Sequence, residues 1–225
     1  QVHPDDELAR KRHGKSGKCE MWYVLEAEPG ASLLTGFSRP IAPAEYERRV
    51  ADNTLTDVLN RQAIASGAVF YLPAGRVHSI GKGSFIVEIQ QSSDITYRIY
   101  DFDRRDAAGN SRELHTELAR EAIDFESSEN SRITYAPENN QEVRLVTTPY
   151  FTTSLYTLTA RTRCAWSATD SFGAIVLLQG SGSLTDNEGN RIDVRQGETW
   201  LLPASTQWTE ITPHTAPLRL LTSRI

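Results

Sequence analysis

Hydrophobic and polar residues alternate over many short stretches of this chain, and the pattern predicts a mainly β protein. These stretches are rich in β-branched and aromatic residues and are bounded by Gly, Pro or Asp, as β-strands are. We expect strands at 20–28, 68–72, 84–90, 95–101, 142–148, 153–160, 174–178, 191–194, 199–202 and 218–222. Many short strands separated by turn signals are typical of a β-sandwich, a barrel or a jelly roll.

Two stretches have helical rather than strand periodicity. In 43–62, apolar residues recur at roughly helical spacing after a proline, and the polar pair Asp52-Asn53 divides the stretch into two predicted helices. A further helix is predicted near 111–123, where Leu114 and Leu118 lie one turn apart. The chain is thus expected to be a β protein with a small helical insertion.

A polar stretch and an internal repeat indicate two units. Residues 126–140 are rich in Ser, Glu and Asn, which predicts a linker. Segment 67–78 aligns with 197–208, with Gly, Leu, Pro and Ala at matching positions. The alternative is that any strand followed by a proline turn looks similar. His78 in the first copy corresponds to Trp208 in the second, so a metal site built on His78 would be missing from the second. We expect the units to be 1–125 and 141–225.

Composition narrows the class of protein. Of 225 residues, 39% are hydrophobic and 24% are charged, as in ordinary soluble proteins, and the net charge of -5 argues against a general nucleic-acid partner. The apolar runs are too short to cross a bilayer, and no signal peptide or transit segment precedes them. Two cysteines, Cys19 and Cys164, are too few for a disulfide scaffold, which favours a cytoplasmic protein. Because the chain begins with Gln rather than Met, we expect N-terminal sequence to be missing.

Several side chains near the N-terminus suit a divalent metal. Gln1 and His3 are two residues apart and therefore share a face in an extended segment, as do Lys18 and Glu20. His78 follows a Pro-x-Gly-x-x-His turn, which predicts that it begins a new strand. This mixed oxygen and nitrogen set suits Zn²⁺. The alternative is an exposed loop histidine at position 3 and a solvated glutamate at position 20.

Charged residues on two later segments are also candidates. Glu88 and Gln90 share one face of an apolar strand, which faces either solvent or a polar cavity. Arg98 lies between aromatic residues and needs an anion or open water: it either pairs with Glu88 or binds a phosphate or a developing oxyanion. Residues 10–18 are basic and contain two glycines, which predicts a solvated, flexible loop that is able to cover an anionic substrate.

Together these motifs resemble the signature of the type I mannose-6-phosphate isomerases (phosphomannose isomerases) of the cupin superfamily. The resemblance rests on Gln-Val-His-Pro-Asp-Asp-Glu at 1–7, Gly-Lys-Cys-Glu-Met-Trp-Tyr at 17–23, Leu-Pro-Ala-Gly-Arg-Val-His-Ser-Ile-Gly at 72–81 and the segment 88–104. It extends in strong motifs to about residue 125, and the C-terminal part fits more loosely as a second, metal-free cupin-like unit. It implies two cupin-type jelly-roll units and a zinc-dependent aldose–ketose isomerase. The reaction implied is interconversion of mannose 6-phosphate and fructose 6-phosphate through a cis-enediol-type intermediate.

The resemblance also implies roles for individual residues. One zinc ion per chain would be bound by Gln1, His3, Glu20 and His78. Catalytic residues would be Lys18, Glu88 and Arg98, with Lys18 and Arg98 also binding substrate. Either Glu88 or a zinc-bound water is the candidate base, and the phosphate would meet Lys18, Arg98 or the basic stretch 10–18. Family members carry an N-terminal segment before the Gln-x-His motif, and we expect this segment to be missing from the present sequence.

Two other functions remain as alternatives. The first is a non-catalytic metal- and sugar-binding cupin, against which the intact Lys18, Glu88 and Arg98 argue. The second is a cupin oxygenase with iron, whose site would usually contain more histidines. The expected partner is a phosphorylated hexose, with no nucleic acid and no membrane. The pattern of strands does not indicate an oligomeric state.

Overall fold

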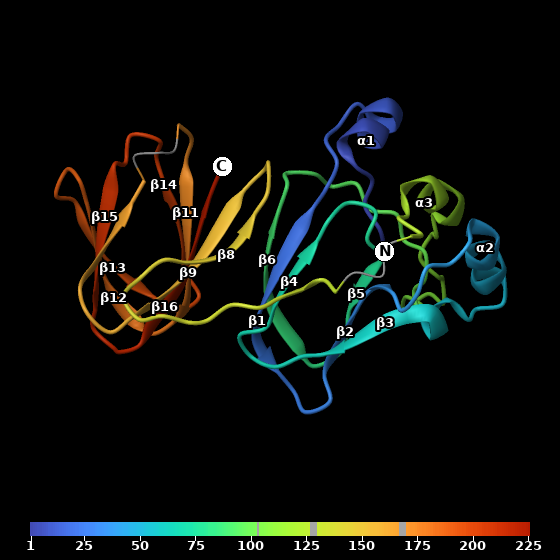
Figure 1. Cartoon of the computed structure of the whole chain (residues 1–225), viewed down its shortest axis with the longest axis horizontal. Helices are drawn as coiled ribbons and strands as arrows, with labels where there is room; N and C mark the ends of the chain where they lie inside the picture. The colour runs from blue at the N-terminus through green and yellow to red at the C-terminus, as the bar shows by residue number, and fades with distance from the viewer. Residues whose placement is uncertain (103, 127–129, 167–169) are drawn as a thin grey trace. The chain divides into compact units, whose positions relative to one another are not determined.

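The computed structural model describes residues 1–102, 104–126, 130–166 and 170–225 (Figure 1). Clustering of contacts divides the chain into two compact units, Gln1–Arg132 and Ile133–Ile225. This boundary lies inside the predicted linker 126–140, of which residues 127–129 lie outside the described residues. Both units consist mainly of antiparallel strands, and the small helical insertion belongs to the first, so the predicted fold class is confirmed.

Unit 1 contains two antiparallel sheets. The first has the order β6-β1-β4-β7, and the second has the order β3-β2-β5. Their bounds are β1 (Glu20–Ala27), β2 (Ser32–Phe37), β3 (Leu59–Ala63), β4 (Val69–Leu72), β5 (His78–Ile80), β6 (Ser84–Gln90) and β7 (Arg132–Ile133). The prediction that His78 begins a strand is confirmed, because it is the first residue of β5.

Strand β1 is central because it pairs with β4 on one side and with β6 on the other. Its alternate residues Glu20, Trp22 and Val24 share a face, and this face is buried. Trp22 and Val24 pack with Phe70 and Leu72 in an apolar cluster. Glu20, at the start of the strand, is the polar end of the same buried face. The strand therefore places one carboxylate beside the hydrophobic core.

The helices of unit 1 differ from the predictions in their lengths. The basic stretch 10–18 is only partly a loop, since α1 (Asp6–His13) includes its first four residues; Asp5 caps the helix by accepting from the Leu8 N–H at 2.8 Å. Of 43–62, only α2 (Pro43–Ala51) and a 3₁₀ turn (Leu55–Val58) are helical, as a split into two helices predicted. Residues 59–63 form β3 instead, because pairing with β2 provides long-range hydrogen bonds that local periodicity does not reveal.

Two further corrections concern the segment before residue 123. The predicted helix at 111–123 is limited to α3 (Thr116–Ala122). The predicted strand at 95–101 forms no ladder: Tyr97 makes one isolated bridge with Val2. Its neighbour Arg98 pairs with His115 instead: the His115 backbone N–H donates to the Arg98 carbonyl, and the Arg98 backbone N–H donates to Nδ1 of the His115 side chain. Successive residues of this segment thus pair with different parts of the chain, so no regular strand forms.

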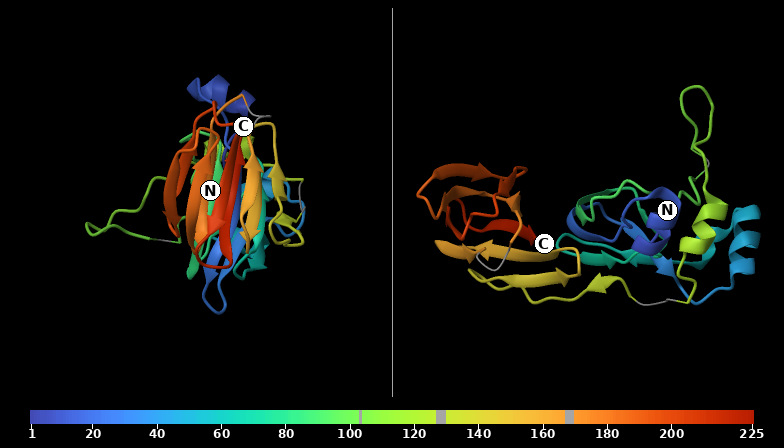
Figure 2. Two further views of the ribbon diagram at one scale, coloured as in Figure 1. Left: turned by 90° about the vertical axis from the view of Figure 1, so that its left-hand side faces the viewer. Right: turned by 90° about the horizontal axis from the view of Figure 1, so that it is seen from above.

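Residues 104–112 form a hairpin-like excursion from unit 1. A bridge between Arg105 and Ser111 joins its two arms, and Asp106 accepts hydrogen bonds from the turn residues at its tip. Figure 2 shows this segment as the thin pale-green loop that extends away from the body of the unit in both views. Because its side chains are exposed, the excursion depends on contacts at its base for its position.

Unit 2 is a sandwich of two antiparallel sheets (Figure 2). Their orders are β14-β11-β16-β9-β8 and β10-β15-β12-β13. The strands are β8 (Val143–Thr147), β9 (Thr152–Leu158), β10 (Thr162–Ala165), β11 (Gly173–Gln179), β12 (Ser181–Asp186), β13 (Arg191–Arg195), β14 (Thr199–Leu202), β15 (Trp208–Pro213) and β16 (Leu218–Arg224). Inward-facing residues such as Ile175, Leu184 and Leu220 form its core.

The repeat seen in the sequence is also a structural one. In the first copy, β4 is followed by a turn and then by His78 at the start of β5. In the second copy, β14 is followed by a turn and then by Trp208 at the start of β15. The Arg163 guanidinium lies over the Trp208 ring, 4.1 Å from its centre. The position that holds an imidazole in the first copy is thus occupied in the second by an indole that packs against an arginine. None of the described helices is both long and apolar enough to span a bilayer.

Candidate metal centre and active site

The N-terminal residues are held as an extended segment alongside β5. The backbone N–H of His78 donates to the Gln1 carbonyl at 2.9 Å, and the N–H of Gly75 donates to the His3 carbonyl at 2.9 Å. Val2, between them, pairs with Tyr97 and is fully buried. Gln1 and His3 therefore share a face, as their spacing predicted, and that face is turned toward β1 and β5.

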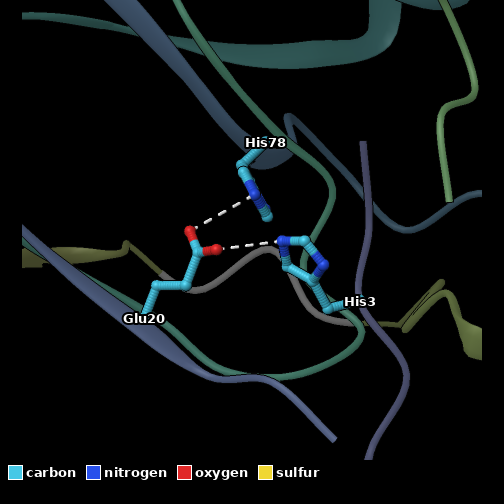
Figure 3. A group of neighbouring side chains, drawn as sticks. All are labelled: His3, Glu20 and His78. Atoms are coloured by element: carbon cyan, nitrogen blue, oxygen red, sulfur yellow. Dashed lines mark ion pairs between the residues drawn. The ribbon is translucent and has the colours of Figure 1, made fainter. Parts of the chain in front are cut away.

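His3, Glu20 and His78 converge on one buried point (Figure 3). The Nε2 atom of His3 lies 3.0 Å from Oε1 of Glu20, and the Nε2 atom of His78 lies 3.5 Å from Oε2. The three side chains are 2%, 0% and 2% exposed. Each side chain offers one ligand atom, and these three atoms lie within 4.8 Å of one another, which is the span that one metal ion bridges. The predicted exposed-loop alternative for His3 is therefore wrong.

Backbone carbonyls set the orientation of both imidazoles. Nδ1 of His3 lies 2.7 Å from the Ile95 carbonyl, and Nδ1 of His78 lies 2.8 Å from the Arg76 carbonyl. A carbonyl only accepts hydrogen bonds, so each Nδ1 carries the proton and each Nε2 keeps a free lone pair. Both lone pairs point to Glu20. This arrangement, with the outer nitrogen anchored, is characteristic of metal-binding histidines.

The charges at this point also fit a cation. Burial by itself raises the pKa of Glu20, but His3, His78 and Lys18 outweigh it and hold the pKa at about 2. Burial lowers the pKa of His78 to about 3. At neutral pH the carboxylate is therefore ionised and the His78 imidazole is neutral, as metal ligands must be.

Unsatisfied atoms provide an independent test of this fit. Nε2 of His3 and both carboxylate oxygens of Glu20 are fully buried, yet none makes a hydrogen bond of normal geometry. Buried polar atoms without partners are costly, and several that face one another indicate a ligand that satisfies them together. The residues present therefore fit a divalent cation.

Gln1 is placed to supply a fourth donor. Its amide nitrogen is 3.0 Å from Nε2 of His78. The nitrogen and oxygen of an amide are assigned from their neighbours, and turning the group by half a rotation presents the oxygen instead. The structure thus brings together all four residues that the sequence proposed as ligands.

Lys18 and Glu88 lie next to this centre. Lys18 is only 8% exposed; its Nζ is 2.8 Å from Oε1 of Glu20 and 3.8 Å from Oε1 of Glu88. The indole N–H of Trp22 donates to Oε2 of Glu88 at 2.9 Å, and the same ring meets His78 edge-on at 5.3 Å. Sequence reasoning missed Trp22. The sequence pattern could have identified Trp22, because it is two residues from Glu20 in β1 and the two side chains therefore share a face.

Arg98 borders a cavity of about 200 Å³ that reaches the metal centre. Its lining consists of Gln1, Trp22, His78, Ser79, Ile80, Arg98, Tyr100, Asp101, Phe102, Arg104 and Arg112. Lys18 and Glu88 are not lining residues. Glu88 contacts Trp22 and Lys18, so the alternative in which it pairs with Arg98 is wrong. Among the described residues, none forms an ion pair with the Arg98 guanidinium, which leaves it available to an anion.

Comparison with known proteins gives a consistent result. No family model matches the chain. It is 33% identical over 204 residues to the mannose-6-phosphate isomerase of Streptococcus mutans, covering 90% of this chain and 63% of that protein. It is 32% identical over 207 residues to the mannose-6-phosphate isomerase ManA of Bacillus subtilis, covering 90% and 64%. The chain thus spans slightly less than two thirds of the length of these relatives.

The fold agrees with the sequence comparison. The crystal structure of the mannose 6-phosphate isomerase from Bacillus subtilis superposes with a TM-score of 0.88 at 28% identity, covering 100% of this chain and 70% of that one. A putative mannosephosphate isomerase from Archaeoglobus fulgidus, at 16% identity and a TM-score of 0.76, shares the fold. The resemblance read from the motifs is confirmed: in sequence and in fold, this chain is similar to these mannose-6-phosphate isomerases.

Proposed function

We propose that the protein is a zinc-dependent aldose–ketose isomerase that interconverts mannose 6-phosphate and fructose 6-phosphate. The observation that supports this most is the buried cluster of His3, Glu20 and His78, at the edge of a cavity that also contains Arg98, for which the described residues provide no ion-pair partner. The names of the relatives point to the same reaction. Gln1, His3, Glu20 and His78 would hold one zinc ion, which supplies Lewis-acid chemistry to the sugar oxygens.

The reaction moves a hydrogen between C1 and C2 of the open-chain sugar. A base removes the proton from one carbon, negative charge develops on the adjacent oxygens in a cis-enediol-type intermediate, and the proton returns to the other carbon. Arg98 is suited to stabilise that charge because it lines the cavity and no carboxylate within the described ranges forms an ion pair with its guanidinium. The Glu88 carboxylate is the proposed base.

The surroundings of Glu88 and Lys18 support their roles. Trp22 donates one hydrogen bond to Glu88 and fixes one carboxylate oxygen, which leaves the other to accept a proton. Lys18 bridges Glu20 and Glu88 and is held almost out of solvent. Its amine lies between two carboxylates beside the metal centre, and its proposed role is to donate a hydrogen bond to a sugar hydroxyl that reaches this centre. We propose a cytoplasmic location, in keeping with a metabolic enzyme whose two cysteines are unpaired.

Metal content and turnover together test the proposal. Purified full-length protein is expected to contain about one zinc per chain by mass spectrometry. Conversion of mannose 6-phosphate should stop on chelation and return with zinc. His78→Ala should lose the metal, whereas His214→Ala, at an exposed position in unit 2, should keep it. Turnover by a metal-free preparation would refute the zinc centre. Binding of metal and sugar phosphate without any turnover would instead favour the non-catalytic sugar-binding cupin.

A further inference from the structure

A second charged cluster, formed by Asp101, Arg104 and Arg112, lines the same cavity. The carboxylate of Asp101 is buried and accepts from two arginines that flank the 104–112 excursion. Nε of Arg112 donates to one oxygen at 2.8 Å, and Nε of Arg104 donates to the other at 3.2 Å. Both side chains keep about half or more of their surface open, at 51% for Arg112 and 63% for Arg104. Each therefore has donors left for another acceptor, since a guanidinium carries five N–H groups.

The charges around the cavity do not balance. Arg98, Arg104 and Arg112 line it, and Asp101 is the one carboxylate among its described lining residues. Hydrogen bonds from Arg112 and Arg104 hold the pKa of Asp101 well below its ordinary range despite burial, so it stays ionised. Arginines do not lose their protons at physiological pH. The lining thus has two more positive than negative charges, one from the cluster of Arg104, Arg112 and Asp101 and one from Arg98, so the cavity as a whole attracts an anion such as a phosphate monoester.

The lining of the cavity combines two kinds of group. Gln1 and His78 of the metal centre border it, and it also contains the two arginines held by Asp101. A neighbouring hollow of about 590 Å³ shares Ser79, Ile80, Phe102 and Arg104 with it, so the space continues beyond these residues. A sugar whose carbonyl end reacts and whose far end carries a phosphate needs this combination of a metal centre and an anion site.

We propose that Arg104 and Arg112, oriented by Asp101, bind the phosphate group of the substrate, so that Arg98 remains free for the reacting end. This inference rests on the proposed function, because it assigns the phosphate of the same substrate. Asp101 is a positioning residue: it sets the direction of both guanidinium groups while leaving their outer N–H groups to the phosphate oxygens. The alternative is that the two ion pairs only anchor the base of the 104–112 excursion.

Kinetics of Arg112 variants in the full-length protein separate these two roles. Arg112→Ala should raise the KM for mannose 6-phosphate by about 10- to 100-fold, as expected for a lost charge-assisted hydrogen bond, and change kcat by much less. Arg112→Ala should also weaken competitive inhibition by inorganic phosphate. Arg112→Lys should restore part of the affinity for phosphate. Arg105→Ala is the matched control, because Arg105 lies on the same excursion but does not line the cavity.

Several outcomes would overturn the proposal. An unchanged KM in Arg112→Ala, with faster proteolysis of the 104–112 excursion, would leave only the anchoring role. Loss of phosphate affinity in Arg61→Ala and Lys82→Ala instead would place the phosphate in the neighbouring hollow. If the wild-type protein turns nothing over, the proposed function fails, but calorimetric titration with inorganic phosphate still tests this site. Binding by wild type and not by Arg112→Ala would support it, and equal binding would refute it.

Discussion

Replacing Glu20 by Gln tests the centre of the site most directly. The substitution keeps the shape of the side chain and removes its charge. In the metal-free protein it leaves the Lys18 ammonium, which is 8% exposed, without its partner at 2.8 Å. The remaining carboxylate, Glu88, is 3.8 Å away. We therefore expect Glu20→Gln to destabilise the metal-free protein, in addition to abolishing metal binding.

Two routes give a similar magnitude. Holding the pKa of Glu20 at about 2 rather than at its ordinary 4.5 corresponds to about 3 kcal/mol, at 1.36 kcal/mol per pH unit. Removing one partner of a buried ion pair generally costs about 3–5 kcal/mol. We expect a loss of about 3 kcal/mol in the free energy of unfolding at pH 7. For comparison, Glu121→Gln breaks the exposed ion pair with Arg12 and should cost less than about 1 kcal/mol.

The pH dependence of this loss follows from the direction of the shift. A carboxylate whose pKa is lower in the folded than in the unfolded state stabilises the fold fully above the unfolded value of 4.5. This contribution disappears as the pH falls toward the folded value of about 2. The difference in stability between wild type and Glu20→Gln should therefore be constant from pH 8 to about pH 5 and shrink below it.

Urea unfolding in the presence of a chelator measures these quantities. Unfolding is followed by circular dichroism at several pH values for wild type, Glu20→Gln, Lys18→Met and the double variant. The double variant should be more stable than the sum of the two single losses predicts, because it leaves no unpaired buried charge. Equal stability of wild type and Glu20→Gln at pH 7, or a loss that does not change with pH, would refute the account of the site as a buried network of charges.

Three more predictions follow from the same structure. Arg98→Ala should reduce kcat by about 100-fold or more while changing the free energy of unfolding by less than about 0.5 kcal/mol, because Arg98 makes no ion pair among the described residues. If kcat and the free energy of unfolding fall by comparable free energies, Arg98 is a structural residue instead. Trp22→Phe removes the N–H that donates to Glu88 at 2.9 Å, and it should lower the free energy of unfolding in urea by about 1–3 kcal/mol. It should also lower kcat more than it changes KM, and unchanged kinetics would show that catalysis does not need this hydrogen bond. Burial raises the pKa of the Cys164 thiol to about 11, so a thiol reagent at pH 8 should label it only after unfolding, and rapid labelling of the native protein would contradict its placement in the core.

Local sequence patterns identified the elements that depend on neighbours along the chain. The strands that contain Glu20 and Glu88 were predicted within a residue of their observed starts. The Pro-x-Gly-x-x-His turn correctly placed His78 at the beginning of a strand. Errors occurred where distant pairing decides the structure. Residues 59–63 form a strand because β2 lies beside them, and 95–101 lack a ladder because Val2 and His115 each occupy one position.

The candidate site divides in the same way. Spacing alone put Gln1 with His3 and Lys18 with Glu20 on common faces, since the period of an extended chain is two residues. Residue types and resemblance then indicated a metal centre. The convergence of three segments on one buried point depends on the pairing of Gln1 with β5 and of β1 with its neighbours.

Other features have no local signal at all. The carbonyls that set the two histidine tautomers, the bond from Trp22 to Glu88, and the two arginines that share Asp101 all join residues that are brought together by the fold. A sequence pattern records which side chains are present and which face they share. It does not record which buried atoms lack a partner or where positive charges exceed negative ones. Those quantities depend on distances through space, and they exist only once the chain has folded.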